Sequence, residues 1–255
     1  MNSILLGLLI GFLIFQLAIF STTLYLHRQL THKAVSFRPI VNEVFRFVIW
    51  TTSGIRPRQW VAVHRKHHAH TDTMEDPHSP KVLGWKRVQL MNVFLYRKVA
   101  KDGKTVSNYA RDLPQRISDR LFYDHAILGL GFLFAGLAIW FGIITAIVAF
   151  TFHSLLYLGL SGSVNSVAHH FGRQSFKTNS GTNVIWLAIL TAGEGLHNHH
   201  HAAPTSARFS RRWYQIDPGW WAIKVMAFLK LANVRHSDVD KLASRTSQIR
   251  NLVRN

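Results

Sequence analysis

The sequence predicts an all-α membrane protein with about three transmembrane helices and a polar cytoplasmic cap of helices. Among its 255 residues, 30 are Lys or Arg and 12 are Asp or Glu, which gives a net charge of +18, yet 48% are hydrophobic. None of these charges lies in residues 1–26 or 125–172, so lipid-like segments alternate with water-like ones. We expect one domain, 1–255, with spans at about 4–26, 122–140 and 143–163 and a cap formed by 27–121 and 164–255.

The first apolar segment, residues 4–26, is long enough to cross a bilayer. At ~1.5 Å per residue a helix of this length spans a hydrocarbon core of ~30 Å. A cleaved signal peptide is the alternative. It lacks support because no basic residues precede the segment and no small-x-small cleavage pattern comes before His27.

The second uncharged segment is too long for a single span and is interrupted near Trp140, Phe141 and Gly142. Two antiparallel spans joined by a tight turn fit it best, and a hairpin in a soluble core is the weaker alternative. Residues 40–55 are also hydrophobic, but they are too few to span and include Glu43 and Arg46. This segment is typical of an interfacial or buried amphipathic helix.

Basic residues set the expected topology, because Lys and Arg favour the cytoplasmic face of a membrane. They flank the spans only on the side of the cap, at Arg28, Lys33, Arg38, Arg116, Arg120 and Arg173. We therefore expect an outward N-terminus and a cytoplasmic cap whose positive charge lies against anionic lipid. Nucleic-acid binding is not expected, because the aromatic residues concentrate in the spans and beside histidines.

Sixteen histidines carry the chemical signal. Two clusters have offsets of 0, 3 and 4, which place three imidazoles on one face of a helix: His64, His67 and His68, and His197, His200 and His201. His27 and His32 are five residues apart, so they converge only if the helix ends or a turn is broken there. Asn165 and His169 share a face at an offset of 4.

These nine imidazoles are too many for one metal ion, so we predict two ions. The spacing alone fits zinc, copper or iron about equally. With no cysteine, the chain has no disulfides, iron–sulfur ligands or cysteine nucleophiles. His199 points away from His197 on a helix, so it is expected behind the ligands or exposed. The other histidines lack a ligand pattern: His70, His78, His125, His153, His170 and His236.

The clusters and their neighbours together resemble the integral-membrane fatty acyl desaturases, specifically the stearoyl-CoA or Δ9 branch and its bacterial members. The resemblance covers the chain from residue 24 to about 230. Besides the histidines it rests on Trp60, four residues before His64, and on the segments 68–80, 165–169, 193–198, 204–208 and 213–217.

The resemblance implies two iron ions as cofactors. It assigns His27, His32, His64, His68 and His200 to one ion, and His67, His169, His197 and His201 to the other, with Asn165 contacting through water. It further implies that O2 and two electrons remove two hydrogens from a saturated acyl chain and leave a cis double bond, with Δ9 the expected position. Trp60, Asp76 and Glu194 lie next to the histidines and are expected to orient them.

The resemblance leaves several partners open. The electron donor is expected to be a separate protein of the ferredoxin, cytochrome b5 or flavin reductase type, in a bacterial-type cytoplasmic membrane. Ala62 and Val63 stand where acyl-CoA members often carry an acidic residue before the histidine cluster. The acyl chain could therefore be carried by CoA, by a lipid or by an acidic protein. Arginines could bind the anionic groups of any of these carriers, namely Arg56, Arg58, Arg208 and Arg211. A membrane lipid or alkane hydroxylase is the alternative enzyme, and a metal-binding sensor is the non-enzymatic one.

Overall fold

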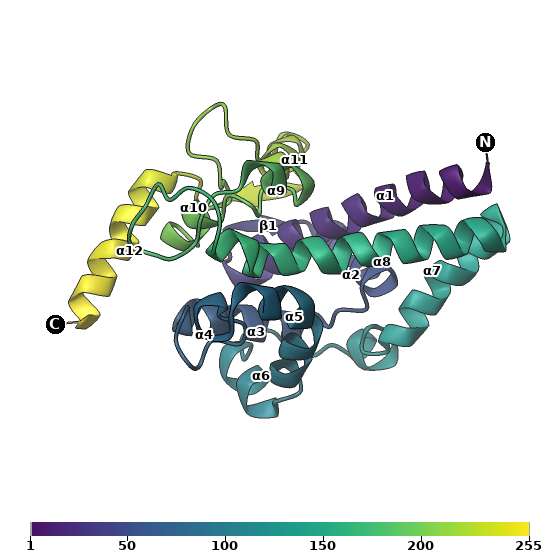
Figure 1. The fold of residues 1–255 in the computed structure, drawn as a ribbon, viewed down its shortest axis with the longest axis horizontal. Coiled ribbons are helices and arrows are strands. Elements are labelled where there is room, and N and C mark those ends of the chain that lie inside the picture. Colours follow the sequence, from purple (N-terminus) through teal and green to yellow (C-terminus); the bar gives the residue numbers. More distant parts are fainter. Residues whose placement is uncertain (1, 255) are drawn as a thin grey trace.

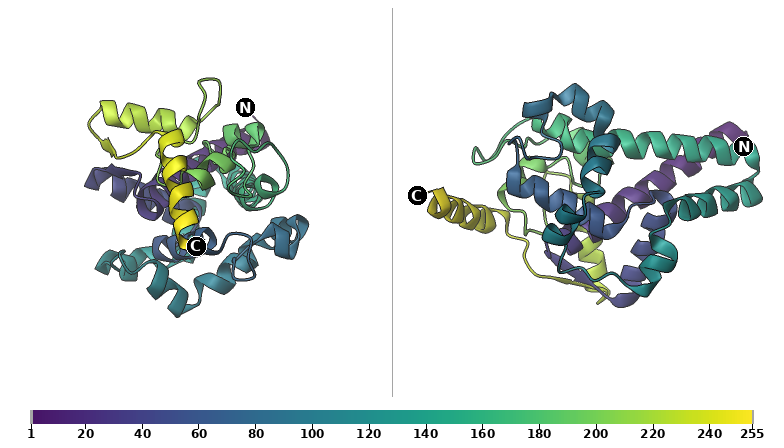
Figure 2. Two further views of the ribbon diagram at one scale, coloured as in Figure 1. Left: turned by 90° about the vertical axis from the view of Figure 1, so that its left-hand side faces the viewer. Right: turned by 90° about the horizontal axis from the view of Figure 1, so that it is seen from below.

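A computed structural model describes residues 2–254 and is mostly helical (Figure 1). Three apolar helices extend together toward the N-terminal end, namely α1 (Ser3–Ser21), α7 (Ala126–Phe141) and α8 (Ile143–Asn165). The shorter elements gather at the opposite end, from which α12 (Val239–Arg254) projects (Figure 2). The C-terminal end of α8 lies among these short elements, so the long helices and the cap pack against each other directly.

Two helical segments are long and apolar enough to cross a membrane, Ser3–Thr31 with 29 residues and Ile143–His169 with 27. They overlap the first and third predicted spans. The second predicted span, at about 122–140, overlaps α7, which begins at Ala126 and has 16 residues. Asp119–Tyr123 instead form a short π-helix, η2, in which the wider turn includes two charged residues.

The helix of the first span does not end at residue 26. It continues as a π-helix, η1 (Thr22–Thr31), whose backbone N–H groups bond to carbonyls five residues earlier rather than four. The bond from His32 N to His27 O, at 3.1 Å, closes its last turn. The apolar helix therefore carries the first histidine cluster directly into the cap.

The cap before α7 consists of short helices joined by tight connections. They are α2 (Pro39–Thr52), α3 (Pro57–His70), α4 (Pro80–Leu83), α5 (Trp85–Ala100) and α6 (Gly103–Tyr109). Helix α2 buries Phe45 and Ile49 but exposes Ile40, Val44 and Phe47. Apolar side chains therefore lie on both its buried and its exposed faces, and its interfacial or buried position stays a prediction.

The cap after α8 contains the 3₁₀-helix η3 (Val167–His169) and the helices α9 (Ile185–Leu190), α10 (His197–Ala202) and α11 (Pro218–Phe228). Two strands, β1 (Val35–Phe37) and β2 (Ala232–Val234), pair antiparallel with Val35 opposite Val234. The expectation of an all-α fold is therefore corrected to a mostly helical one. The strand pair joins the segment after η1 to the segment after α11, which are far apart in the sequence.

A buried apolar cluster fixes η1 within the cap. Leu24 and Leu26 of η1 pack with Phe45 and Ile49 of α2 and with Ile223 of α11. Leu26 is fully buried and directly precedes His27, so apolar packing fixes the backbone from which the first histidine extends.

Candidate metal centre

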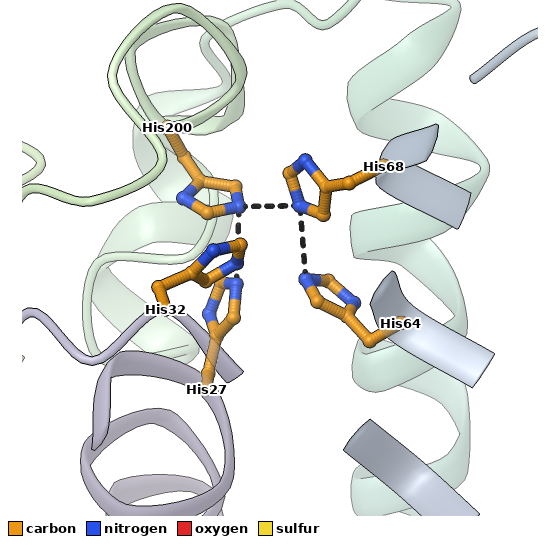
Figure 3. A group of neighbouring side chains, drawn as sticks. All are labelled: His27, His32, His64, His68 and His200. Atoms are coloured by element: carbon orange, nitrogen blue, oxygen red, sulfur yellow. Dashed lines mark hydrogen bonds between the residues drawn. The ribbon is translucent and has the colours of Figure 1, made fainter. Parts of the chain in front are cut away.

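The structure brings the nine clustered histidines together into two adjacent groups. One contains five side chains, His27, His32, His64, His68 and His200, and the other four, His67, His169, His197 and His201. Within each group the ring nitrogens lie within 4.8 Å of one another. Figure 3 shows the five-histidine group, with rings from three separate parts of the chain pointing toward a common centre. Membership is the same as the resemblance implies, while ligation itself stays a prediction.

The π-helix η1 explains how two histidines five residues apart enter one group. In an α-helix an offset of five residues rotates the second side chain ~140° from the first. In η1 the wider turn places residue i+5 almost above residue i, and the rings of His27 and His32 lie 5.0 Å apart. A widened last turn at the end of the helix, with His32 as the residue after η1, brings the first cluster together.

Each of the helices α3 and α10 supplies both groups. On α3, His64 and His68 enter the five-histidine group and His67 enters the other. On α10, His200 enters the five-histidine group while His197 and His201 enter the other. On each helix the two histidines four residues apart enter the same group. The third histidine, His67 on α3 or His200 on α10, enters the neighbouring group.

Burial favours the neutral form of six of these imidazoles, which is the form that binds a metal ion. Removal from water, together with neighbouring histidines, holds the pKa far below 6.5 for His32, His64, His68, His197, His200 and His201. Uncharged imidazole rings this close together stabilise one another only weakly.

Contacts between the rings fit a shared cation better than mutual hydrogen bonding. The Nε2 atom of His200 lies 3.0 Å from Nε2 of His27 and 2.9 Å from Nε2 of His68. A neutral Nε2 either donates one hydrogen or offers one lone pair, so it cannot form hydrogen bonds with two other Nε2 atoms at once. Two nitrogens ~2.1 Å from one ion and at right angles to each other would lie ~3.0 Å apart, so the spacing suits metal ligands. Five nitrogens also exceed the four ligands of an ordinary zinc site.

Two carboxylates hold the far nitrogens of histidines in these groups. Nδ1 of His27 donates to Glu194 at 2.8 Å, and Nδ1 of His67 donates to Asp76 at 3.0 Å. Burial opposes ionisation of Asp76, but the bond from His67 and the other nearby donors outweigh it and lower the pKa of Asp76 to about 2. Glu194 behaves alike: burial raises its pKa, and His27 more than reverses this effect. Anionic partners that fix Nδ1–H leave Nε2 free to bind an ion.

The remaining predicted residues lie beside the groups. Trp60 stacks on the ring of His64, with centroids 4.8 Å apart and planes 12° from parallel. Asn165 is half-buried at the last position of α8, near His169 in the chain. His199 is buried, belongs to neither group, and its Nδ1 donates to Phe209 O at 2.9 Å.

Sequence reasoning missed His78, which lacks a repeating neighbour. It is 4% exposed, its ring stacks on His67 at 4.6 Å, and it forms a third group with His67 and Asp76. The signal available was its place two residues after Asp76, whose Oδ1 accepts the His78 backbone N–H at 3.0 Å. His153 was also left without a role. It is buried in α8, with Nε2 2.7 Å from Thr52 O.

A cleft of ≈ 240 Å³ lies next to η1, and its lining includes four arginines and two aspartates, Asp119 and Asp124. Arginines line it from three elements, Arg46, Arg56, Arg58 and Arg116. Arg46 is already paired with Glu43 and Asp119, and Arg56 donates to Asp124 O at 2.6 Å. Arg58 Nε is buried without a hydrogen-bond partner in the described residues, so it has capacity for an anionic group.

Two buried groups of imidazoles that could hold metal ions, at the end of helices long and apolar enough to cross a membrane, define a mostly helical, histidine-rich class of protein. The chain belongs to the fatty acid desaturase family, because the family described as Fatty acid desaturase matches residues 3–237. It is therefore an oxidoreductase that acts on fatty acyl chains.

The chain is similar to several named desaturases. It is 35% identical over 222 residues to an "Acyl-CoA C20 Delta5-desaturase" of Anemone leveillei, covering 84% of this chain and 68% of that protein. It is 30% identical to "Delta-9 acyl-lipid desaturase 2" of Arabidopsis thaliana, covering 89% and 73%. It is 33% identical to the "sn-1 stearoyl-lipid 9-desaturase" of Synechocystis sp., covering 82% and 65%. The chain thus spans between 65% and 73% of the length of these three relatives.

Proposed function

We propose that the two histidine groups hold two iron ions, one in each group, with Asn165 contacting the ion of the four-histidine group through water. The observation that carries this proposal is the convergence of nine imidazoles into adjacent groups of five and four. Iron supplies redox chemistry with O2 that zinc lacks and that breaking an unactivated C–H bond requires.

The proposed reaction removes two hydrogens from a saturated acyl chain and leaves a cis double bond at Δ9, using O2 and two electrons. Relatives named as Δ9 desaturases support the position, although the Anemone relatives are named for Δ5. In this reaction the protein fixes which methylene pair meets the metal centre, because the methylenes of a saturated chain differ little in reactivity. Glu194 and Asp76 hold the ligand imidazoles, and Trp60 holds the ring of His64 by stacking.

The acyl carrier is proposed to bind at the arginine-lined cleft. An anionic carrier group, whether a CoA phosphate or a lipid phosphate, would meet the unpartnered Nε of Arg58 and the guanidinium of Arg56. Relatives named for acyl-CoA and for acyl-lipid substrates support both kinds of carrier. The electrons are proposed to come from a separate donor protein of the ferredoxin, cytochrome b5 or flavin reductase type.

The chain is proposed to be one domain in a bacterial-type cytoplasmic membrane, with three spans and the cap in the cytoplasm. Support comes from the two long apolar helices, from α7 antiparallel to α8, and from basic residues that flank them at the cap side. Helix α7 exposes Ile127, Phe132 and Ile139, as a lipid-facing helix would.

Fatty-acid methyl-ester profiling of a host that expresses the chain tests the function. Dimethyl disulfide adducts locate any new double bond, and His200→Ala serves as the inactive control. We expect cis alkenes at Δ9 with the wild-type chain and none with the variant. Hydroxylated chains without new alkenes would instead establish the lipid hydroxylase.

A further inference from the structure

Arg28, the residue after His27, places a buried charge beside the five-histidine group. Its Nη2 donates to Asp217 Oδ1 at 2.9 Å and to Ala192 O at 3.1 Å, and its Nη1 donates to Ala207 O at 2.7 Å. Both side chains of the ion pair are 0% exposed. Burial of two charges is costly unless every donor and acceptor finds a partner, so a pair this deep requires a matched surrounding.

Both carboxylate oxygens of Asp217 accept further hydrogen bonds in addition to the bond from Arg28. Its Oδ2 accepts the backbone N–H of Phe209 at 2.6 Å and of Ser210 at 3.3 Å, and its Oδ1 also accepts the N–H of Trp220 at 2.9 Å. One carboxylate therefore joins three segments: the end of the first span through Arg28, the chain after α10, and the start of α11. This arrangement is called the Arg28–Asp217 clamp below.

Two glycines make room for the guanidinium. A Cβ atom on Gly193 would lie 2.8 Å from Arg28 Nη2, and one on Gly219 would lie 2.7 Å from the same atom. Gly193 also has a φ angle of +103°, a backbone conformation that residues with a side chain rarely adopt. Since Glu194 follows Gly193, the backbone that packs on the guanidinium also positions the carboxylate that holds His27.

The clamp reaches the metal ligands through an aromatic ring. The guanidinium carbon of Arg28 lies 3.9 Å from the centroid of the Phe209 ring, and this ring lies 4.9 Å from His200 and 5.6 Å from His27. On its other side, Arg28 Nε donates to Thr23 Oγ1 at 3.3 Å, and Thr23 donates to Glu194. Both routes end on histidines of the five-histidine group.

We propose that Arg28 and Asp217 are positioning residues for the ion of the five-histidine group, a role that rests on the proposed two-iron centre. The clamp fixes His27 through Glu194 and fixes His27 and His200 through the Phe209 ring. Its loss lowers the affinity of the five-histidine site by roughly 10- to 100-fold, the range found when groups behind metal ligands are removed. The four-histidine site keeps its ion.

The test measures iron per chain and the Mössbauer spectrum of purified protein in detergent, before and after a graded chelator. Asp217→Asn retains the size of the side chain and removes its charge. We expect it to retain about one iron where the wild-type chain retains two, with the signal of one site lost. Arg28→Lys keeps the charge but not the fork of donors, and we expect an intermediate loss.

The matched control is Asp240→Asn, which breaks the exposed ion pair between Arg211 and Asp240, 2.6 Å apart, in the same part of the cap. It should keep both irons. In a His27→Ala background, where the five-histidine site is already impaired, Asp217→Asn should cost no further iron.

Retention of both irons by Asp217→Asn would overturn the proposal, and so would equal loss from both sites, which would indicate a purely structural ion pair. If Asp217→Asn does not fold, Phe209→Leu decides, because it keeps the ion pair and removes the ring that contacts His27 and His200. Weaker binding at the five-histidine site alone supports the proposal, and unchanged binding overturns it. Iron content is independent of the product, so hydroxylated acyl chains would defeat the proposed function while leaving this inference standing.

Discussion

The bond between Glu194 and His27 offers a sharp test of how carboxylates shape the metal centre. His27 Nδ1 lies 2.8 Å from Glu194 Oε1, and Thr23 donates to the same oxygen. Glu194→Gln keeps the length of the side chain and an amide oxygen that can still accept, so it removes mainly the negative charge. The charge makes the imidazole of His27 a stronger donor to a cation and selects the tautomer with a free Nε2.

The expected cost follows from the loss of one such partner. Removing a group behind a metal ligand weakens binding roughly 10- to 100-fold, which is about 1.4 to 2.8 kcal/mol. Chelator titration of the purified protein measures iron retention, and methyl-ester profiling of the host measures the rate of desaturation. We expect iron to be released at lower chelator concentration and the rate to fall in parallel.

Glu75→Gln is the matched control. Glu75 Oε2 lies 2.7 Å from His70 Nδ1, so the same kind of pair is broken on a histidine outside both groups, with a carboxylate side chain that is 68% exposed. This variant should keep its iron and its rate. Full iron content and full rate in Glu194→Gln would refute the reasoning, because the carboxylate would then have no effect on the ion.

Three further predictions test other parts of the structure. His200→Ala should abolish new double bonds and iron in the five-histidine site, whereas His199→Ala, whose ring bonds to Phe209 O and Ser175, should keep both; iron analysis and methyl-ester profiling compare them. Gly11→Ala should destabilise the packing of α1 on α8 by about 1–3 kcal/mol, because its Cβ would lie 2.6 Å from Ala149 O, while Gly159→Ala, with nothing within 4 Å, should not; thermal unfolding in detergent measures the difference. Asp112→Asn should lower stability at neutral pH by at most about 1 kcal/mol. Hydrogen bonds from its arginine and lysine partners lower the pKa of Asp112, so its contribution is present above the unfolded pKa of 3.8 and is lost as pH falls below that value; unfolding curves of the variant should therefore depend less on pH in that acid range.

The sequence predicted the histidine groups better than it predicted the helix that delivers the first of them. Offsets of 3 and 4 are sufficient to place His64, His67 and His68 on one face, because the α-helix has a fixed period. The offset of 5 between His27 and His32 demanded an irregularity, and its form was open. A π-helix has no distinct residue pattern, since only the hydrogen-bond register differs, so tertiary packing around Leu24 and Leu26 decides it.

Residues that act through long-range contacts escaped prediction for a different reason. Arg28 and Asp217 are 189 positions apart in the sequence, and nothing in the sequence near either residue indicates that the two form a buried ion pair. Their burial depends on Gly193 and Gly219, whose lack of a side chain matters only once the fold is known.

The division of neighbouring histidines between the two groups has a consequence for the metal centre as a whole. His67 and His68 on α3 enter different groups, as do His200 and His201 on α10, and in both pairs the ring centroids are 5.5 Å apart. The separation of the two proposed ions is therefore set twice, by consecutive residues on two packed helices, rather than by flexible loops. Since a helix fixes the direction of consecutive side chains, the two ions would keep their spacing while acyl chain and electron donor come and go. Moving either histidine pair by one residue would disrupt both sites together, which sets these positions apart from the Arg28–Asp217 clamp, where we expect a single site to fail.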